Sequence, residues 1–560
     1  MNISWGKEII HQLIMHGVDY FCLSPGSRIT PLALAIAEDP RARTFVHYDE
    51  RGCAFHALGF AKATGRAAVI LTTSGTAIGN IMPAVMEASL SRIPLILLTA
   101  DRPPELRDTH ANQTIDQIKL FSNFVRFAFD LPAADPQLPQ RFLATTLAQA
   151  VFRAQNNPAG PVHINCMFRE PFFVEEFPYM PEIPCYYQST CTALPQQMVE
   201  NWAEKLSEIE KGVIIVGSLH TKDSRESIVK LGKKLDWPIL SDIDSGMRSY
   251  VNAAPIIPRY DLILKAISTL CPDAILHFGD QLVSKLLLEF ASDAAISLYV
   301  HVAEHPYRTD PKHTVTHRIA CNPCSFAEAI EPYISEKISW LNLWKEYADA
   351  ADEHPEMKDN EISEPGIIQW LLQNITDEYA LFFANGMPVR DANNFFYPKR
   401  PCGPIFTNRG VSGIDGNIGT IAGISEGADR PLIALIGDQT ALHDINSLSQ
   451  LKKTKYPIIL FIINNHGSGI FSFLPVHENI PPPLFEEYFA AAHAIHFEHA
   501  AALFNLPYYH PKNWVELSDV PFTESCIIEL TTDRARSFAL RKHIQESYEN
   551  CITARISRSP

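Results

Sequence analysis

The sequence predicts an α/β protein made of three doubly wound parallel-sheet domains, and three observations support this fold class. The chain has 560 residues, more than one hydrophobic core normally holds. Short apolar runs alternate with segments of helical periodicity, as in sheets wound from strand and helix units. Aperiodic segments rich in proline or charge separate three such stretches. We therefore place the domains at residues 1–180, 196–345 and 366–560.

The first domain contains three clear predicted strands, at residues 18–23, 67–71 and 94–98. Each is a short apolar run followed by a turn and then by residues with helical periodicity. Prolines between Pro171 and Pro195 then punctuate a stretch without periodicity. This stretch is typical of a linker.

The middle and third domains repeat this pattern. The predicted strands lie at 212–217, 237–240, 274–279, 296–301, 379–384, 404–407, 431–436 and 457–463. Glycines at the strand ends of the middle domain are compatible with a nucleotide fold, but no G-x-G-x-x-G follows them. We therefore favour a structural domain that contributes a few residues to a site. A charged connection near 352–365 separates these two domains.

Composition argues against several classes of protein. With 47 basic and 63 acidic residues, the formal net charge of −16 disfavours a nucleic-acid or anionic-membrane surface. No run approaches 18 apolar residues, and the N-terminus lacks a signal-peptide pattern. Eleven cysteines form no regular framework. We expect a cytoplasmic protein without a membrane span.

Two small clusters could hold a metal, but a plainer interpretation is favoured for each. Cys321 and Cys324 form a C-x-x-C pair, yet no second pair follows at zinc spacing, so a strand-end loop is expected. His493, His496 and His499 are three residues apart and could share a helix face. Apolar residues between them indicate packing instead of zinc binding.

Residues 431–471 contain the most informative pattern of the chain. A hydrophobic strand ends at Gly437-Asp438, a helix-like segment follows, and a second hydrophobic strand ends at Asn464-Asn465. Both strand ends lie on one edge of a parallel sheet, so Asp438 and Asn465 can meet around one hard cation. The helix N-termini that follow offer N–H groups to a diphosphate. An ordinary strand-end turn is the alternative.

This pattern also resembles the Gly-Asp and Asn-Asn motif of thiamine diphosphate enzymes, although Gln439 stands where many members have glycine. The resemblance implies thiamine diphosphate held through Mg²⁺ or Mn²⁺ by Asp438, Asn465 and the Gly467 carbonyl. Such chemistry needs a carboxylate against the aminopyrimidine ring. Glu50, which follows a short strand and opens an apolar helix, is the candidate. Taken alone, Glu50 could equally be a helix-start charge favoured by the dipole.

Further segments resemble, in the same order, those of the 2-succinyl-5-enolpyruvyl-6-hydroxy-3-cyclohexene-1-carboxylate synthase family of the menaquinone pathway. These segments lie at 24–28, 49–52, 73–76, 99–106, 111–113, 412–416 and 470–475. The resemblance implies a transferase that decarboxylates 2-oxoglutarate and adds the succinyl carbanion to isochorismate in a 1,4 manner. It also implies a homodimer or dimer of dimers, in which Glu50 of one chain faces the cofactor diphosphate held by another.

Both implied substrates are dianions, so an acidic chain must place cations locally. Arg28, Arg102, Arg390 and Arg409 all follow predicted strand ends, on the side where ligands bind such sheets. Guanidinium groups can bind both oxygens of a carboxylate. A surface salt bridge is the alternative for each arginine alone, but their joint placement favours a pocket.

The resemblance also assigns roles to individual residues. Arg390 and Arg409 are assigned to the oxoacid, and Glu50, Gln113 and Arg390 are counted as catalytic. The residues assigned to isochorismate are Ser27, Arg28, Arg102, Gln113 and Lys285.

An apolar wall and two departures complete the predicted site. Ile470 and Phe471 at the cofactor and Leu474 at the substrate would exclude water from the carbanion, although core packing would explain them too. Gly386 stands where better-known members have serine, and Leu286 replaces a basic residue that some members carry after Lys285. Substrate contacts are therefore expected to differ in detail.

Two other functions are compatible with parts of the sequence. One is a different thiamine-dependent 2-oxoacid decarboxylase or an acetohydroxyacid-type synthase that uses pyruvate, for which a smaller uncharged pocket would suffice. The other is a catalytically silent binding or regulatory protein. The joint presence of Glu50, Asp438 and Asn465 argues against the second.

Overall fold

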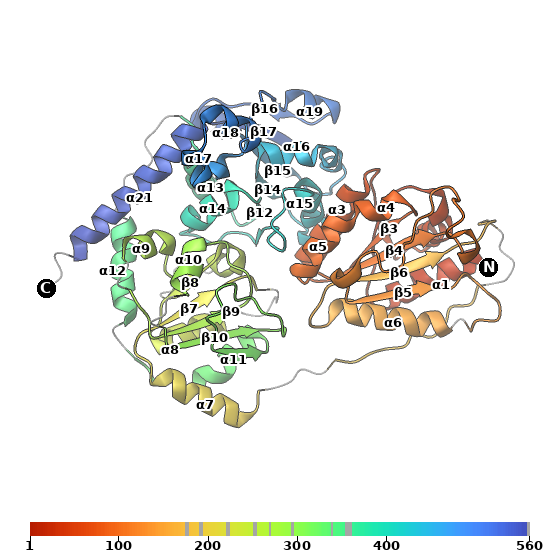
Figure 1. The fold of residues 1–560 in the computed structure, drawn as a ribbon, viewed down its shortest axis with the longest axis horizontal. Helices are drawn as coiled ribbons and strands as arrows, with labels where there is room; N and C mark the ends of the chain where they lie inside the picture. Colours follow the sequence, from red (N-terminus) through yellow and green to blue (C-terminus); the bar gives the residue numbers. More distant parts are fainter. Residues whose placement is uncertain are drawn as a thin grey trace.

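The structure is a computed structural model with three parallel β-sheets, each in its own region of the chain (Figure 1). It describes residues 1–139, 141–173, 179–189, 194–219, 225–249, 255–267, 270–292, 296–337, 340–352 and 361–556. The predicted fold class is confirmed, because every strand pairing among these residues is parallel apart from isolated bridges. The exact domain limits stay a prediction.

The first sheet has six strands in the order β2-β1-β3-β4-β6-β5. These strands are β1 (Tyr20–Leu23), β2 (Arg43–Val46), β3 (Ala68–Thr72), β4 (Leu95–Asp101), β5 (Phe127–Leu131) and β6 (Pro161–Met167). The helices are α1 (Asn2–Met15), α2 (Thr30–Glu38), α3 (Glu50–Thr64), α4 (Thr76–Asn80), α5 (Met82–Leu90) and α6 (Arg141–Gln155). Alternate residues of β3 enter two separate apolar clusters, one on each face. Because both faces of the first sheet are buried, its central strands are almost continuously apolar.

The middle sheet has five strands in the order β11-β10-β9-β7-β8. These are β7 (Gly212–Val216), β8 (Ile239–Ser241), β9 (Ala274–Phe278), β10 (Leu298–Ala303) and β11 (His317–Ala320). The helices are α7 (Gln196–Ser207), α8 (Glu226–Leu235), α9 (Tyr260–Ala266), α10 (Lys285–Phe290), α11 (Pro323–Ile330) and α12 (Trp340–Asp352).

The third sheet has six strands in the order β13-β12-β14-β15-β17-β16. These are β12 (Ala380–Phe383), β13 (Ile405–Phe406), β14 (Leu432–Gly437), β15 (Ile458–Asn464), β16 (Tyr508–Tyr509) and β17 (Cys526–Thr531). Its helices are α13 (Glu364–Asn374), α14 (Met387–Phe395), α15 (Asn417–Ala428), α16 (Asp438–His443), α17 (Val476–Asn479), α18 (Pro482–Tyr488), α19 (Glu498–Leu503), α20 (Trp514–Ser518) and α21 (Arg534–Ile556).

Two connections predicted from the sequence lie partly outside the described residues. Of the linker predicted at 171–195, the described part at 179–189 forms neither helix nor strand. Of the connection predicted at 352–365, residues 353–360 lie outside the described residues, and α13 already begins at Glu364. The helix starts there because Pro365 suits its first turn.

The first and third domains meet through α3 and α15, which run side by side with their backbones close together along their length (Figure 1). A Cβ atom on Gly59 would lie 2.1 Å from the carbonyl oxygen of Thr420, and one on Gly423 would lie 1.9 Å from that of His56. Glycine is therefore required on both helices, because any side chain would force them apart.

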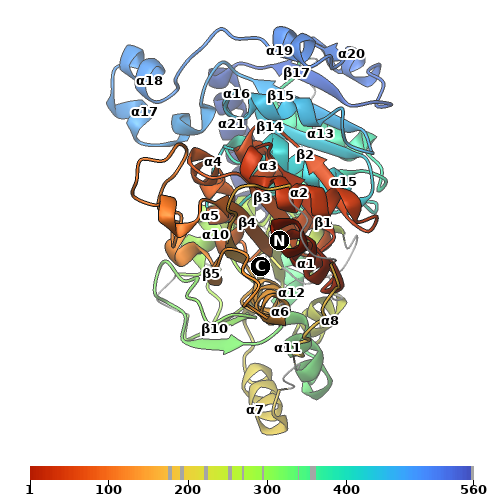
Figure 2. The same ribbon diagram turned by 90° about the vertical axis from the view of Figure 1, so that its right-hand side faces the viewer.

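The long helix α21 connects the third domain to the middle one (Figure 1). It packs against α9 and α12 of the middle domain, and Tyr548 and Ile552 enter apolar clusters there. In the view of Figure 2 the third sheet lies above the first and the middle domain lies below. Among the described residues no helix is long and apolar enough to cross a bilayer.

The glycine contact predicts the effect of adding a side chain. We expect Gly59→Val to destabilise the packing of the first domain on the third by about 1 to 3 kcal/mol, because the new atoms meet backbone and not a movable side chain. Thermal unfolding followed by circular dichroism measures this. Gly79→Val in α4 is the control, since a Cβ at Gly79 meets nothing within 4 Å. Equal unfolding temperatures for the two variants would contradict the prediction.

Candidate active site

A cavity of about 350 Å³ lies at the carboxyl ends of β12, β14 and β15 in the third domain. Seven residues predicted from the sequence line this cavity: Arg390, Arg409, Asp438, Asn465, Gly467, Ile470 and Phe471. They come from the loops and helices that follow the strand ends, as expected for ligand binding to an open α/β sheet.

Asp438 is the first residue of α16 and is only 3% exposed. Its Oδ1 accepts a hydrogen bond from the Gln439 N–H at 2.6 Å, and its Oδ2 accepts one from the Gly467 N–H at 2.9 Å. Burial raises the pKa of Asp438 despite these donors. A carboxylate in this position is therefore stabilised by a cation.

Asn465 follows β15, and the two atoms of its side-chain amide have different surroundings. Its Nδ2 donates to Glu364 Oε1 at 2.9 Å, which fixes the orientation of the amide. Its Oδ1 is buried and lacks a hydrogen bond within the described part of the chain. An unpaired buried acceptor is costly, so a ligand is the natural partner for this oxygen.

Glu364 is an important residue of this site that sequence reasoning missed. It is 2% exposed and also accepts hydrogen bonds from Thr532 Oγ1 and from Arg541 of α21. Arg541 pairs with Asp391 of α14 as well. Burial alone would raise the pKa of Glu364, but Arg541 and the hydrogen bonds lower it. Because α21 follows this glutamate by more than 170 residues, no local motif signals the contact.

Gly467 and Gln439 fix the position of the loop after β15, next to Asp438. Gly467 has φ +148°, and a Cβ there would lie 2.7 Å from the Ala490 carbonyl oxygen. Gln439 donates from Nε2 to the same carbonyl at 2.8 Å and accepts from the Ser468 hydroxyl. The glutamine that departs from the common motif therefore ties two loops together. The role of the Gly467 carbonyl as a ligand stays a prediction.

Two guanidinium groups share the cavity with Asp438. Arg409 donates from Nη1 to Asn385 Oδ1 at 2.8 Å, and Arg390 donates to the Gly386 carbonyl at 2.5 Å. Burial and the nearby Arg409 lower the pKa of Arg390. Two cations held so close, in a partly buried site, attract an anion.

Gly386, one of the two departures noted in the sequence, also lines the cavity. Its φ is +96°, which favours glycine, although a Cβ there would meet only the Pro388 ring at 3.7 Å. The backbone and not the available space therefore favours glycine at this position. Leu286, the other departure, lies in α10 of the middle domain.

Glu50 does not line this cavity within the same chain. Asp49 caps α3 by accepting from the N–H groups of Arg51 and Gly52, and Glu50 therefore sits in the first turn. Its carboxylate accepts from Asn80 Nδ2 at 3.2 Å.

The remaining residues predicted in the first domain follow the carboxyl ends of its own strands. Arg28 donates to the Phe168 carbonyl at 2.8 Å and pairs with Glu170. Arg102 donates to the Ser74 hydroxyl. Burial and the positive charge of Arg28 lower the pKa of Arg102.

Gln113 and Ser27 accompany this arginine pair. Gln113 has φ +60° and donates from Nε2 to the Ser74 carbonyl at 3.4 Å. Ser27 is exposed at the start of a short helical turn that also holds Arg28. The chain thus carries two groups of predicted site residues, one on the first sheet and one on the third.

The other predicted residues lie outside both groups. The Lys285 side chain is 89% exposed and pairs with Glu289, and Leu474 is 46% exposed outside the cavity. Cys321 directly follows β11, and Cys324 packs within the core of the middle domain. Cys321 thus lies in the expected strand-end loop, but Cys324 already belongs to α11, which begins at Pro323.

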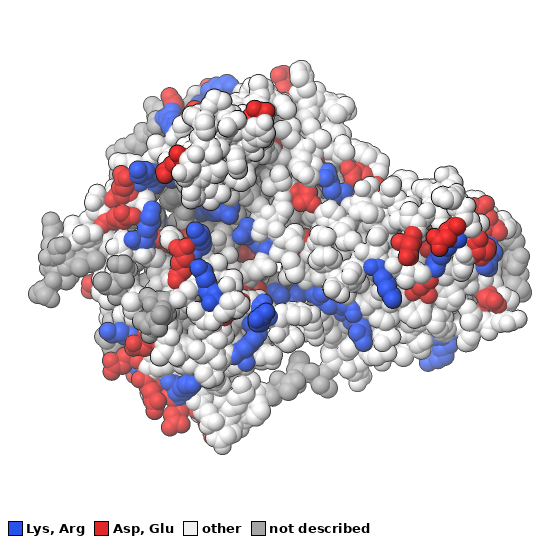
Figure 3. Space-filling view, in the orientation of Figure 1, with Lys and Arg blue, Asp and Glu red and all other residues white. Residues whose placement is uncertain are grey.

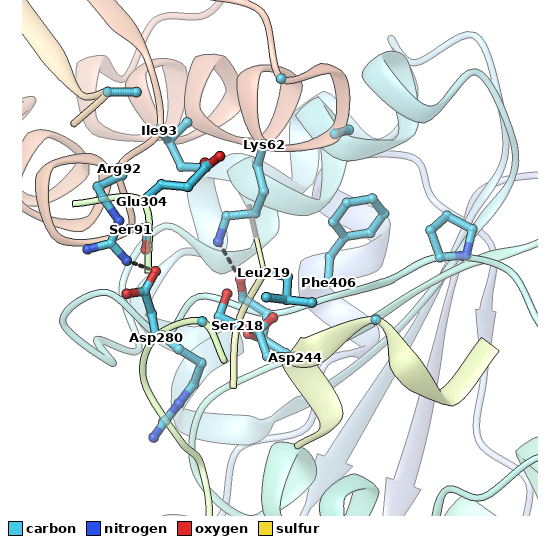
Figure 4. A pocket seen from close by; sticks show the side chains of 18 of the residues that line it. Lys62, Ser91, Arg92, Ile93, Ser218, Leu219, Asp244, Asp280, Glu304 and Phe406 are labelled. Carbon is cyan, nitrogen blue, oxygen red and sulfur yellow. Dashed lines mark hydrogen bonds and ion pairs between the residues drawn. The ribbon is translucent and has the colours of Figure 1, made fainter. Parts of the chain in front are cut away.

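A larger cavity of about 670 Å³ lies where the three domains meet (Figure 4). Arg92 pairs with Asp280 across it, and Lys62 donates to the Thr407 carbonyl and to Asn408 Oδ1. Basic side chains gather along this hollow in Figure 3. Of the predicted site residues this cavity contains only Arg409, whereas seven of them line the smaller cavity. We therefore assign the active site to the smaller cavity.

Comparison with known proteins agrees with this architecture. Residues 3–120 match the N-terminal thiamine pyrophosphate-binding domain of thiamine pyrophosphate enzymes, 182–383 match their middle domain, and 385–504 match their C-terminal binding domain. Benzoylformate decarboxylase from Polynucleobacter necessarius has the same fold, with a TM-score of 0.76, 15% identity, and coverage of 94% of this chain and 98% of that chain. The protein is therefore a thiamine pyrophosphate enzyme.

The family within this class follows from closer relatives. The 2-succinyl-5-enolpyruvyl-6-hydroxy-3-cyclohexene-1-carboxylate synthase of Rubrobacter xylanophilus is 40% identical over 97% of this chain and 98% of its own length. That of Salinibacter ruber is 36% identical over 98% and 97%. Protein PHYLLO of Arabidopsis thaliana is 32% identical over 95% of this chain and 34% of its own length. The chain belongs to the 2-succinyl-5-enolpyruvyl-6-hydroxy-3-cyclohexene-1-carboxylate synthase family.

The contact between Glu364 and Asn465 predicts that Glu364 controls ion affinity. We expect Glu364→Ala to weaken divalent-ion binding in the presence of thiamine diphosphate by about 10- to 100-fold, because the Asn465 amide is no longer oriented. Titration with Mn²⁺, followed by electron paramagnetic resonance, measures this affinity. Glu364→Gln keeps an acceptor oxygen and should retain most of it. Thr532→Val, which removes only a 3.2 Å hydrogen bond to the same carboxylate, is the control. Wild-type affinity in Glu364→Ala would refute the assigned role.

Proposed function

We propose that the protein uses thiamine diphosphate to decarboxylate 2-oxoglutarate and adds the resulting succinyl unit to isochorismate. The product would be 2-succinyl-5-enolpyruvyl-6-hydroxy-3-cyclohexene-1-carboxylate, an intermediate in menaquinone or phylloquinone formation. The names of the bacterial relatives support this product. The observation that carries the proposal is the presence of Arg390 and Arg409 in the same cavity as Asp438 and Asn465.

The residues of the third domain fit a hard divalent cation bound to a diphosphate. The buried Asp438 carboxylate and the unpaired Asn465 oxygen are the ligand types that Mg²⁺ prefers, and Mn²⁺ accepts similar oxygen ligands. The short helix α16 begins at this edge, where backbone N–H groups favour anions. We assign the ion to Asp438, Asn465 and the Gly467 carbonyl.

When bound, thiamine diphosphate supplies the electron sink for loss of carbon dioxide from a 2-oxoacid. The protein's own contribution is to bind the substrate and exclude water. Arg390 and Arg409 would hold the distal carboxylate of 2-oxoglutarate, which pyruvate lacks. Ile470 and Phe471 line the same cavity and would limit premature protonation of the carbanion. Glu50 would contact the aminopyrimidine ring.

The acceptor is assigned to the first-domain group. Arg28 and Arg102 would bind the carboxylates of isochorismate, with Ser27 and Gln113 as polar contacts and Lys285 as a further cation. Since Glu50 lies outside the third-domain cavity in its own chain, we propose that two chains assemble so that each cavity receives Glu50 from the other. A homodimer or a dimer of such dimers satisfies this requirement.

The two arginines of the third-domain cavity, Arg390 and Arg409, lead to a prediction about which 2-oxoacid the protein uses. Release of carbon dioxide should be much faster from 2-oxoglutarate than from pyruvate, and isochorismate should convert the product from succinic semialdehyde to the cyclohexene carboxylate. Arg409→Gln should raise KM for 2-oxoglutarate by about tenfold or more, because one charged hydrogen bond is lost. Exposed Arg400→Gln is the control. A preference for pyruvate would favour a pyruvate-dependent decarboxylase or synthase instead.

The proposed role of Glu50 predicts that a variant can bind thiamine diphosphate and still fail to decarboxylate the substrate. Glu50→Gln should bind thiamine diphosphate and its ion almost normally, yet lose decarboxylation by at least about 100-fold, because the ionisable carboxylate at the ring is gone. Calorimetric titration and carbon dioxide release measure the two effects separately. Unchanged turnover would refute the role.

The same variant tests the assembly. Mixing Glu50→Gln chains with inactive Asp438→Ala chains, under conditions that allow exchange, should restore activity, because one site of each mixed dimer combines two intact halves. Glu50→Gln chains treated in the same way without the second variant provide the baseline. A site built within one chain would give no restoration.

A further inference from the structure

A second group of ligand-type side chains lies at the carboxyl end of the third sheet, beyond Asn465. Glu529 belongs to β17, which pairs with β15, and His510 directly follows β16 at the edge of the sheet (Figure 1). His496 lies just before α19. The candidate ligand atoms of these three residues all lie within 4.8 Å of one another.

Glu529 provides a completely buried carboxylate. Its Oε1 accepts from Asn464 Nδ2 at 2.8 Å, and its Oε2 accepts from the Phe497 N–H and the Tyr508 hydroxyl, both at 2.8 Å. Burial opposes ionisation, but these donors lower the pKa of Glu529. His496 Nδ1 lies 2.6 Å from the Glu529 carboxylate and is a histidine, which carries a charge only when protonated. A buried negative charge without a permanent cation is costly and would gain from one.

The two histidines are accessible and suited to bind a metal. The sequence left open that His493, His496 and His499 share a helix face, but α19 begins only at Glu498, so they do not. The His496 side chain is half exposed, which gives an ion access from solvent. Burial, and then the nearby Lys512, lower the pKa of His510 and favour the neutral imidazole that metals require.

We propose that His496, His510 and Glu529 form a binding site for one divalent transition-metal ion of the zinc class, separate from the ion at Asp438 and Asn465. Two imidazoles and one carboxylate are a ligand set of zinc and its neighbours, whereas Mg²⁺ prefers oxygen alone. Water would complete the coordination. The hydrogen bonds from Asn464 and Tyr508 hold the carboxylate in place, as outer partners do in metal sites.

The Lys512 ammonium group lies where the proposed metal ion would bind to His510. Its Nζ lies 3.0 Å and 2.9 Å from the two ring nitrogens of His510. The residue is exposed, so its flexible side chain can move into solvent when an ion binds. The ammonium thus marks a position where positive charge is favoured, and removing it should strengthen metal binding.

The site adjoins the cofactor edge without sharing its ligands. Asn464, the last residue of β15, donates to Glu529 and directly precedes Asn465. An ion at Glu529 would therefore act on a residue next to the one that binds the cofactor's ion. The two positions differ in chemistry, so excess Mg²⁺ should fill the oxygen site and leave the imidazole site open to a transition metal.

The test is a Co²⁺ titration of the full-length protein saturated with thiamine diphosphate and excess Mg²⁺, after alkylation of accessible thiols. Visible absorption of the bound ion should reveal one equivalent with nitrogen and oxygen ligands, displaced by Zn²⁺. His496→Gln and His510→Gln should each weaken binding by about tenfold or more. Lys512→Ala should strengthen it. His499→Gln, exposed in α19, is the matched control and should bind Co²⁺ like the wild type.

Several outcomes would overturn the proposal. These are no binding of Co²⁺ in the millimolar range, wild-type affinity in both His496→Gln and His510→Gln, or a signal that disappears as Mg²⁺ is raised. Circular dichroism and the unfolding temperature of the ion-free variants show whether they are folded. We expect them to fold, because neither histidine is fully buried. Neither histidine belongs to the proposed catalytic groups, so activity without added transition metal should be unchanged.

Discussion

The parallel pairing of β14 with β15 is the constraint on which the active site depends. Leu432 lies opposite Ile458, and the register continues to Gly437 opposite Ile463. Because the strands run in the same direction, the chain leaves both at one edge, and Asp438 and Asn465 emerge side by side. The parallel register thus brings the two proposed ligands, Asp438 and Asn465, to neighbouring positions. Glu364 accepts a hydrogen bond from the Asn465 amide, and the Gly467 N–H donates one to Asp438.

Most of the sheets could be predicted from the sequence because strands buried on both faces are almost uniformly apolar. The strands missed are those that break this pattern. In β6, His163 and Asn165 are buried, and both hydrogen-bond to the Thr99 hydroxyl of the neighbouring β4. Likewise β17 carries Glu529, whose charge is satisfied by donors from other segments. A hydrophobicity pattern does not detect a strand whose buried polar residues gain their hydrogen-bond partners only after folding.

The candidate site also has parts that the sequence signals and parts that it does not. Asp438 and Asn465 could be proposed from the sequence because each belongs to a short motif at the end of a recognisable strand. Glu364 and Arg541 could not, because their contact joins the start of α13 to α21 across the whole third domain. The place of Glu50 also goes beyond the sequence. Its helix and its cap are local, but its position relative to the cavity depends on how domains and chains assemble.

The glycine-lined packing of α3 against α15 limits how domains of such enzymes can be exchanged between relatives. With backbone against backbone at Gly59 and Gly423, the two surfaces must match atom for atom, and neither helix can adapt by changing a rotamer. A hybrid protein that takes only its first domain from a relative would contain the relative's α3 but not the matching α15. Successful hybrids should therefore exchange the two helices together, and a hybrid with a different middle domain would also have to match α21, which packs against α9 and α12.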